Sequence, residues 1–220
     1  SSVTIIGNNT FIRCSSISSA LTIPRSVSLI SSTAFYQCSS IPSLIFESNS
    51  KLEEIGKEAF SNCYGIINAL TIPDSVSLVG NKAFNNCYNI TGTLTLSKNI
   101  KRINPYTFCF CSSISSIQFN DNNTEIGSDA FSNCYNLTEI TLPNNITSIF
   151  DYAFYNCYSL VTVNLPSELK LIDRYAFSYC VSLKNIDLPV NLTTISSYAF
   201  KNCISIQKFV FREKLSSFGY

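Results

Sequence analysis

The chain contains no histidine, methionine or tryptophan, and charged residues make up only 13% of it. Without an imidazole it cannot form a serine–histidine or cysteine–histidine pair, so any catalysis would have to rest on carboxylates. The few charges nearly cancel, leaving a formal net charge of +1. A basic face that neutralises a phosphate backbone is therefore not expected, and we predict that nucleic acid is not a partner.

Long apolar runs are also missing, since none approaches the roughly 18 residues that a membrane helix needs. We therefore expect no direct membrane insertion by this chain. It has neither a methionine nor a charged N-terminal region followed by an apolar stretch, and we expect it to be a piece of a longer protein. A hydrophobic content of 45% is too high for a disordered segment.

What the chain does contain is a repeat. A phenylalanine is followed three residues later by a cysteine nine times, at intervals of 23 to 25 residues. A fixed period of this length predicts a solenoid, in which each repeat buries its apolar face only by stacking on its neighbours. The pairs are Phe11/Cys14, Phe35/Cys38, Phe60/Cys63, Phe84/Cys87, Phe108/Cys111, Phe131/Cys134, Phe154/Cys157, Phe177/Cys180 and Phe200/Cys203.

Each repeat continues with an alternating apolar triplet that is typical of a short strand, as in Ile140-Thr141-Leu142. The last triplet is Phe209-Val210-Phe211. A second apolar column, such as Ile149, lies five residues before each phenylalanine and is expected to point inward. The alanine before most of these phenylalanines, such as Ala153, predicts a short helical turn.

The predicted fold is an α/β repeat solenoid of about nine repeats of 23–25 residues, with one parallel β-sheet, short helical turns and a right-handed coil. Residues 1–220 would form a single domain that is truncated in mid-repeat at both ends, because Ile6 and Phe218 occupy equivalent columns without a complete repeat around them.

The segment Leu137-x-x-Ile140-x-Leu142 matches the LxxLxL core of leucine-rich repeats. Pro143, Ile149 and Cys157 restrict the match to one type of leucine-rich repeat. The chain resembles the BspA-like leucine-rich repeat family over its whole length. This resemblance implies a curved solenoid displayed on the surface of bacteria or parasitic protists, with roles in adhesion to host matrix proteins or cells. It implies no individual functional residue, because the family marks a scaffold and leaves the ligand open.

Ten cysteines in an extracellular protein would ordinarily suggest disulfides. Nine of them occupy one column, where a parallel stack spaces equivalent residues by about 4.8 Å, so a bridge would have to twist out of the core. We expect buried free thiols and no metal, since no histidine is available to complete a zinc site. Cys109 lies outside the column among polar residues, so we predict an exposed thiol there, either incidental or available for an intermolecular bridge.

A column two residues before the phenylalanines carries tyrosine in the C-terminal half of the chain. These side chains either stack to hold repeats together or provide rigid anchors for a protein partner. The predicted partner-binding residues are Tyr106, Tyr152, Tyr175 and Tyr198.

Six N-x-Ser/Thr sequons lie between the strand triplets, so glycans on them would leave the strand face open. The candidate acceptors are Asn8, Asn89, Asn122, Asn136, Asn145 and Asn191.

Carboxylates on the outer strand face are too sparse for catalysis. Glu139 and Asp187 lie two repeats apart, about 10 Å, which is at or beyond the upper limit for a glycosidase pair. We therefore predict a protein that is not an enzyme and needs no cofactor. It would be a secreted or cell-surface module for recognition and adhesion, binding a host matrix or cell-surface protein. The alternative is the ligand-sensing ectodomain of a larger membrane receptor, and a polysaccharide-processing enzyme is a third, less favoured class.

Overall fold

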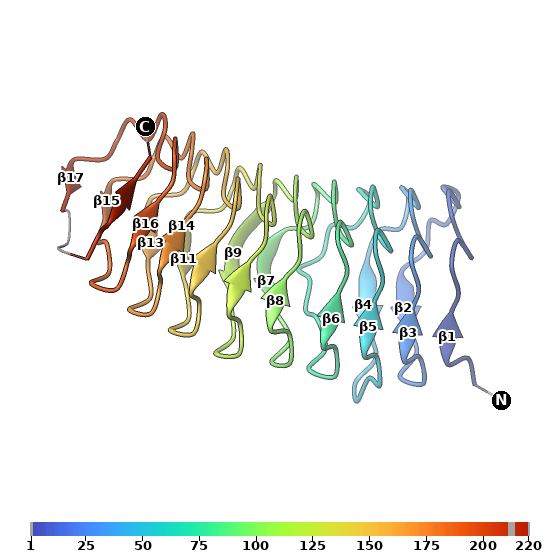
Figure 1. Ribbon diagram of the computed structural model, residues 1–220. Coiled ribbons are helices and arrows are strands. Elements are labelled where there is room, and N and C mark those ends of the chain that lie inside the picture. Colours follow the sequence, from blue (N-terminus) through green and yellow to red (C-terminus); the bar gives the residue numbers. More distant parts are fainter. Residues whose placement is uncertain (1, 211–213, 220) are drawn as a thin grey trace.

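The computed structural model is a parallel β-solenoid of about nine turns, and it describes residues 2–210 and 214–219. Figure 1 shows the turns stacked in chain order, with the two termini at opposite ends of the stack. Phe211, the last residue of the final predicted triplet, lies outside the described residues. The repeat length therefore predicted the architecture, and the sense of the coil stays a prediction.

The apolar triplets form a first ladder of parallel strands, because their alternating side chains bury one face and leave the other in solvent. The ladder is divided into the sheets β2-β4, β7-β9 and β11-β13-β15-β17. Its strands are β2 (Leu21–Ile23), β4 (Leu44–Phe46), β7 (Gly92–Thr95), β9 (Ile114–Gln118), β11 (Glu139–Thr141), β13 (Thr162–Asn164), β15 (Asn185–Ile186) and β17 (Lys208–Phe209).

A second parallel ladder, which the sequence pattern did not reveal, runs through the apolar column before the phenylalanines. The prediction of one sheet was therefore incomplete: the strands here are two residues long, too short to show alternation. This ladder is divided into the sheets β1-β3-β5-β6 and β8-β10-β12-β14-β16-β18. Its strands are β1 (Ile5–Ile6), β3 (Leu29–Ile30), β5 (Glu54–Ile55), β6 (Leu78–Val79), β8 (Arg102–Ile103), β10 (Glu125–Ile126), β12 (Ser148–Ile149), β14 (Leu171–Ile172), β16 (Thr194–Ile195) and β18 (Ser217–Phe218).

The predicted helical turns are wrong, since the described residues contain no helix. Each Ala-Phe segment is a turn whose amides bond to the next repeat, as when Phe35 N–H donates to the carbonyl of Ala59 at 2.8 Å. Two left-handed residues bracket every such segment, for example Tyr152 (φ 57°) and Asn156 (φ 58°). A residue with φ near +60° cannot continue a right-handed helix, so the chain turns instead.

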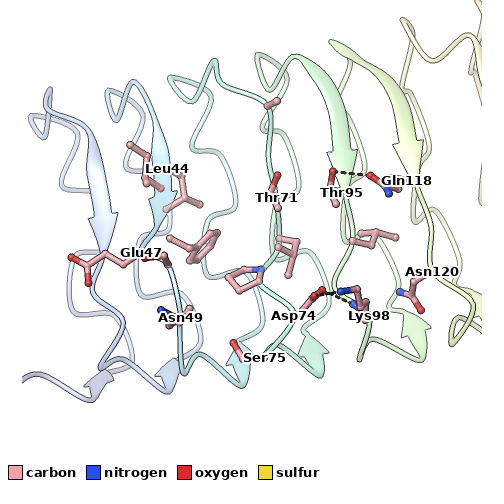
Figure 2. Close-up of a pocket in the computed structure, with 18 of the residues that line it drawn as sticks. Leu44, Glu47, Asn49, Thr71, Asp74, Ser75, Thr95, Lys98, Gln118 and Asn120 are labelled. Atoms are coloured by element: carbon pink, nitrogen blue, oxygen red, sulfur yellow. Dashed lines mark hydrogen bonds and ion pairs between the residues drawn. The ribbon is translucent and has the colours of Figure 1, made fainter.

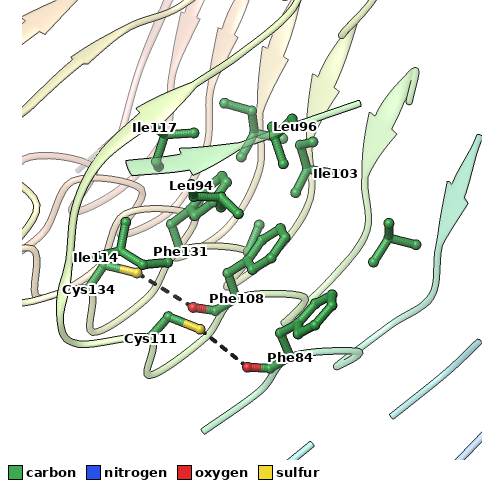
Figure 3. Packing of buried hydrophobic residues seen from close by; sticks show 14 of the residues in the cluster. Phe84, Leu94, Leu96, Ile103, Phe108, Cys111, Ile114, Ile117, Phe131 and Cys134 are labelled. Atoms are coloured by element: carbon green, nitrogen blue, oxygen red, sulfur yellow. Dashed lines mark hydrogen bonds between the residues drawn. The ribbon is translucent and has the colours of Figure 1, made fainter. Parts of the chain in front are cut away.

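The core lies between the two ladders and the Phe-Cys wall. The phenylalanine rings form one continuous stack, with centroids 5.1 to 5.6 Å apart from Phe11 to Phe200. Figure 3 shows Phe84, Phe108 and Phe131 in this stack beside Cys111 and Cys134. The nine in-column cysteines are free, as predicted, and seven of them are fully buried, with Cys14 and Cys203 partly exposed near the ends. The inward columns were correctly assigned.

Candidate functional site

Three of the four predicted tyrosines form a continuous strip. The rings of Tyr152 and Tyr175 stack with centroids 4.8 Å apart, and those of Tyr175 and Tyr198 stack at 4.9 Å. All three backbones are left-handed, with φ between 55° and 63°. This conformation is uncommon for a bulky residue and is set by the repeat, whose other members at this column include Asn9 and Asp129. The strip therefore places aromatic rings where the backbone alone would favour asparagine, aspartate or glycine.

The strip widens into a larger aromatic surface that the column analysis missed. Tyr155 packs edge-on against Tyr152 at 5.4 Å and against Tyr179 at 5.6 Å. Burial, and then the neighbouring tyrosines, raise the pKa of Tyr155, which indicates that the rings crowd one another. We call the set Tyr152, Tyr155, Tyr175, Tyr179 and Tyr198 the tyrosine surface. Its signal in the sequence was a tyrosine one residue after Phe154 and another two residues after Phe177.

Two cations lie over rings of the tyrosine surface. The guanidinium of Arg174 lies 5.5 Å from the ring centre of Tyr175, and the ammonium of Lys201 lies 5.3 Å from that of Tyr198. Cations at these distances are attracted to the face of an aromatic ring. Tyr198 is still 47% exposed, so the surface keeps accessible aromatic area at its C-terminal end.

Tyr106, the fourth predicted tyrosine, does not join the strip, because Asp129 occupies the column between it and Tyr152. The negative charge of Asp129, and then burial, raise the pKa of Tyr106, while burial raises the pKa of Asp129 itself. Lys82 lies 5.5 Å from the Tyr106 ring centre. Tyr106 thus belongs to a small polar cluster, although it is 39% exposed.

Cys109 is not an exposed thiol, which corrects the prediction. Only 4% of the residue is exposed, and burial, and then the charge of Asp129, raise the pKa of its thiol to about 12. The error came from judging the column by polarity, because its serines are buried as well, with Ser61 at 2% and Ser178 at 0% exposure. A thiol this inaccessible and this weakly acidic is unsuited to an intermolecular bridge.

The sequon asparagines divide into two groups. Four of them donate a side-chain hydrogen bond to a backbone carbonyl of the preceding repeat, so their amide nitrogens already hold the stack together; these are Asn89, Asn122, Asn145 and Asn191. Asn8 and Asn136 are outside this group and are exposed, although Asn122 and Asn145 within the group are exposed as well. Glycosylation stays a prediction for all six, and Asn8 and Asn136 are the acceptors whose modification would disturb the fold least.

A second surface feature is an open groove of about 1060 Å³ on the first strand ladder. Its floor includes Ile45, Thr71, Thr95 and Gln118, and Figure 2 shows the last three side by side on successive turns. Asp74 and Lys98 form an ion pair of 2.6 Å at its side, which lowers the pKa of Asp74. No column argument predicted this groove.

The described part of the chain forms neither a metal centre nor a membrane-spanning helix. Over residues 2–210 and 214–219, no three cysteine, aspartate or glutamate side chains lie close enough together to hold a metal ion. Within the same ranges, no helix has the length and apolarity needed to cross a bilayer.

Three solved structures share the fold at identities too low to carry function. A leucine rich cell surface protein from Faecalibacterium prausnitzii is 21% identical, with 93% of this chain and 76% of that chain covered and a TM-score of 0.55. The T. pallidum leucine rich repeat protein is 24% identical, with 83% of this chain and 72% of that chain covered and a TM-score of 0.57. The pneumococcal vaccine antigen PcpA is 21% identical, with a TM-score of 0.60. The match covers 99% of this chain but only 64% of the PcpA chain.

The search of curated proteins found no match. The family model of the BspA type leucine rich repeat region matches residues 4–137 and 101–220, with six copies. These two ranges together span nearly the whole solenoid described above, including both strand ladders and the Phe-Cys wall. The chain therefore belongs to the BspA-type leucine-rich repeat family.

Proposed function

We propose that this chain is a non-catalytic recognition module that acts at a cell surface and binds a host matrix or cell-surface protein through its tyrosine surface. The observation that carries the proposal is the stacking of Tyr152, Tyr175 and Tyr198 at 4.8 and 4.9 Å on a rigid turn. Rings held in this way lose little conformational entropy when a partner covers them, and tyrosine is enriched among the residues that dominate binding energy.

The fold relatives support the location. One is described as a cell surface protein and another as a vaccine antigen, and both share this solenoid. The absence of histidine and the separation of the outer carboxylates support a binding role over catalysis. The ligand-sensing receptor ectodomain would use the same surface and differ only in the parent chain, so a cytoplasmic signalling domain in that chain would favour it.

The test begins with a screen of immobilised matrix and cell-surface proteins by surface plasmon resonance. For each partner found, the wild type is compared with the triple variant Tyr152→Asn, Tyr175→Asn and Tyr198→Asn. Asparagine tolerates the left-handed backbone, so the variant removes the rings without straining the turn. We expect the Kd to rise by about a hundredfold or more, because each ring of a binding centre contributes roughly 1 to 2 kcal/mol.

The matched control is the triple variant Thr22→Ala, Thr141→Ala and Thr162→Ala on the first strand ladder. These residues are exposed and lie outside the groove. We expect it to bind as the wild type does. Loss of binding in this variant alone, with both variants folded, would move the site to the strand face and refute the assignment to the tyrosine surface.

A further inference from the structure

The groove arises where the repeats depart from their common length. Leu44 lies six positions after Cys38, as in all repeats from the fifth onward, whereas the spacing is seven positions in the first, third and fourth repeats, as from Cys63 to Leu70. The loop that follows β4 is longer, since Ile55 lies nine positions after Phe46 and the equivalent spacing in the other repeats is seven. The second repeat is thus shorter before its strand, and longer after it, than the repeats on either side.

The first ladder is interrupted between the second and third repeats. Among the described residues, no strand pairing joins residues 44–46 to residues 70–72, whose sole bridge is between Thr71 and Thr95. The side chain of Asn68 fills part of the gap: its carbonyl oxygen accepts from Leu44 N–H at 3.0 Å, and its amide donates to the Leu44 carbonyl at 3.1 Å. An asparagine amide here takes the place of a neighbouring strand for one residue only.

The side chain of Asn68 forms hydrogen bonds with the backbone of Leu44 but none with that of Phe46. In a parallel strand, residues two apart direct their backbone groups to the same side, so Phe46 turns its N–H and carbonyl toward the gap as Leu44 does. Phe46 and Thr71 both line the groove. The groove therefore offers main-chain hydrogen-bonding groups that the regular repeats consume in their own ladder.

The side chains around the gap combine an apolar floor with acidic residues, of which Glu47 accepts a hydrogen bond of 2.9 Å from Arg25 N–H. Ile45 is 46% exposed, although it occupies the strand position that carries threonine in several other repeats. Lining charges are Glu47, Asp74, Asp121 and Lys98. Lys98 pairs with Asp74, and within the described chain neither Glu47 nor Asp121 forms an ion pair. The groove therefore carries an excess of negative charge.

We propose that this groove binds an extended peptide segment of a protein partner that carries lysine or arginine beside apolar residues. The main chain of such a segment complements the free groups at the gap, its apolar side chain covers Ile45, and its cations face Glu47 and Asp121. From β4 to β9, with residues 70–72 and β7 between them, the first ladder spans about 14 Å, which an extended chain crosses in four to five residues.

This site lies apart from the tyrosine surface, and the inference does not depend on the function proposed for that surface. The probes are the acetylated, amidated pentapeptide Lys-Val-Thr-Val-Lys, its counterpart Glu-Val-Thr-Val-Glu and the sugar cellopentaose. Each is titrated into the ¹⁵N-labelled chain at low salt while amide chemical shifts are followed. We expect the lysine peptide to shift the amides of Ile45, Thr71 and Gln118, and the other two probes to leave them unchanged.

The matched variants distinguish a specific site in the groove from nonspecific attraction of a cationic peptide to exposed acidic side chains. The double variant Glu47→Gln and Asp121→Asn removes two negative charges that form no ion pair within the described chain. It should raise the Kd of the lysine peptide by about fivefold to tenfold. The pair Glu139→Gln and Asp187→Asn removes the same charge from exposed positions of the regular repeats and should change nothing. The triple Tyr→Asn variant should also bind the peptide normally.

Three results would overturn the proposal. The first is the absence of shifts with the lysine peptide, and the second is an equal loss of affinity in the two charge variants. The third is a response of the same amides to cellopentaose, which would identify a glycan site instead. Because none of these variants alters the tyrosine surface except the triple Tyr→Asn one, failure here leaves the proposed function standing.

Discussion

The thiol of Cys63 donates a hydrogen bond of 3.0 Å to the carbonyl oxygen of Phe35, 28 residues earlier in the chain. The same carbonyl accepts the amide of Cys38 at 3.1 Å, so it is shared by two repeats. Equivalent thiol bonds recur from Cys38 to Cys203, and Figure 3 shows two of them. The cysteine column is therefore a ladder of donors as well as a set of small apolar side chains.

This ladder should make the fold sensitive to alkali. Burial raises the pKa of Cys87 and of Cys157 to about 12, above the ordinary value of 9.0. Below about pH 8 these thiols stay protonated in both states and stability is unaffected. Above about pH 9 the unfolded chain loses protons that the folded chain keeps, so the free energy of unfolding falls by up to about 1.4 kcal/mol per pH unit for each thiol.

Guanidinium denaturation at pH 7.5, 9.0 and 10.0, with a reductant present, measures the effect. Lysines and tyrosines also titrate in this range, so the informative comparison is with the double variant Cys87→Ala and Cys157→Ala. Its stability at pH 7.5 should be lower, and its loss between pH 9.0 and 10.0 should be smaller. Parallel losses in the two proteins would show that the thiols ionise as readily in the fold as in the unfolded chain.

Core and face positions should differ sharply in their contribution to stability. The ring of Phe154 is fully buried and stacks between Phe131 at 5.5 Å and Phe177 at 5.3 Å. Phe154→Ala should therefore cost about 3 to 5 kcal/mol. Thr141 is exposed and accepts one hydrogen bond from Asn164, so Thr141→Ala should cost under about 1 kcal/mol. Urea denaturation compares the two variants, and equal losses would contradict the assignment of inward columns.

The columns that could be predicted are those in which packing allows only one kind of side chain. A buried stack accepts phenylalanine at every turn, as at Phe154, and a strand triplet needs alternation, as at Ile140. The non-helical turn around each Ala-Phe segment was not predicted, because its sequence signal is weaker. Asparagine recurs directly before the cysteine, as at Asn62, and the structure shows that this residue adopts a left-handed backbone. Read in that way, the recurring Asn-Cys pair argues against a helical turn.

The candidate site was only partly within reach of the sequence. Stacking of Tyr152, Tyr175 and Tyr198 follows from equal spacing in a rigid array, and it was predictable. The groove depends on how the longer segment before Leu70 is accommodated beside the shorter one before Leu44. The same difference in length between the first and second repeats leaves β2 paired with β4, so spacing alone does not predict the gap. The structure shows that the side chain of Asn68 takes over the pairing of Leu44, a solution that no pattern of polarity indicates.

Phe110→Asn should stabilise the protein. Phe110 has φ 59° and is 42% exposed, so its ring gains little burial while its backbone occupies a region that favours asparagine. On the same column, Asn86 donates to Asn62 at 3.0 Å and Asn156 donates to Asn133 at 3.0 Å. The new asparagine would stand between Asn86 and Asn133 and could extend this ladder.

The expected gain is about 0.5 to 1 kcal/mol, from relief of the strained backbone. Differential scanning calorimetry should show it as a rise in Tm. Phe110→Ala is the control, because it removes the same ring and lacks the side-chain amide. A gain of the same size in both variants would show that exposure of the ring, and not the backbone or the ladder, is the cause.

Asn68→Ala should open the interrupted ladder at Leu44. The change removes three hydrogen bonds, two to the backbone of Leu44 and one to the carbonyl of Ala69 at 2.8 Å. Leu44 is buried, so its backbone groups would be left without a partner, and we expect a loss of about 1 to 3 kcal/mol in urea denaturation. Hydrogen exchange at the Leu44 amide should accelerate, while exchange at amides of the regular repeats stays slow.

Asn68→Asp separates the two halves of this interaction. An aspartate could still accept from the Leu44 N–H, but its charged form has no proton to give to the Leu44 carbonyl and would repel it. At pH 7 the variant should therefore be at least as unstable as Asn68→Ala. Protonation restores a donor, so its deficit relative to the wild type should shrink once the pH is low enough to protonate the carboxyl. Asn164→Ala, which removes only an exposed side-chain contact, serves as the control. If Asn68→Ala cost no more than Asn164→Ala, the Asn68 amide would not be what holds the ladder at the gap.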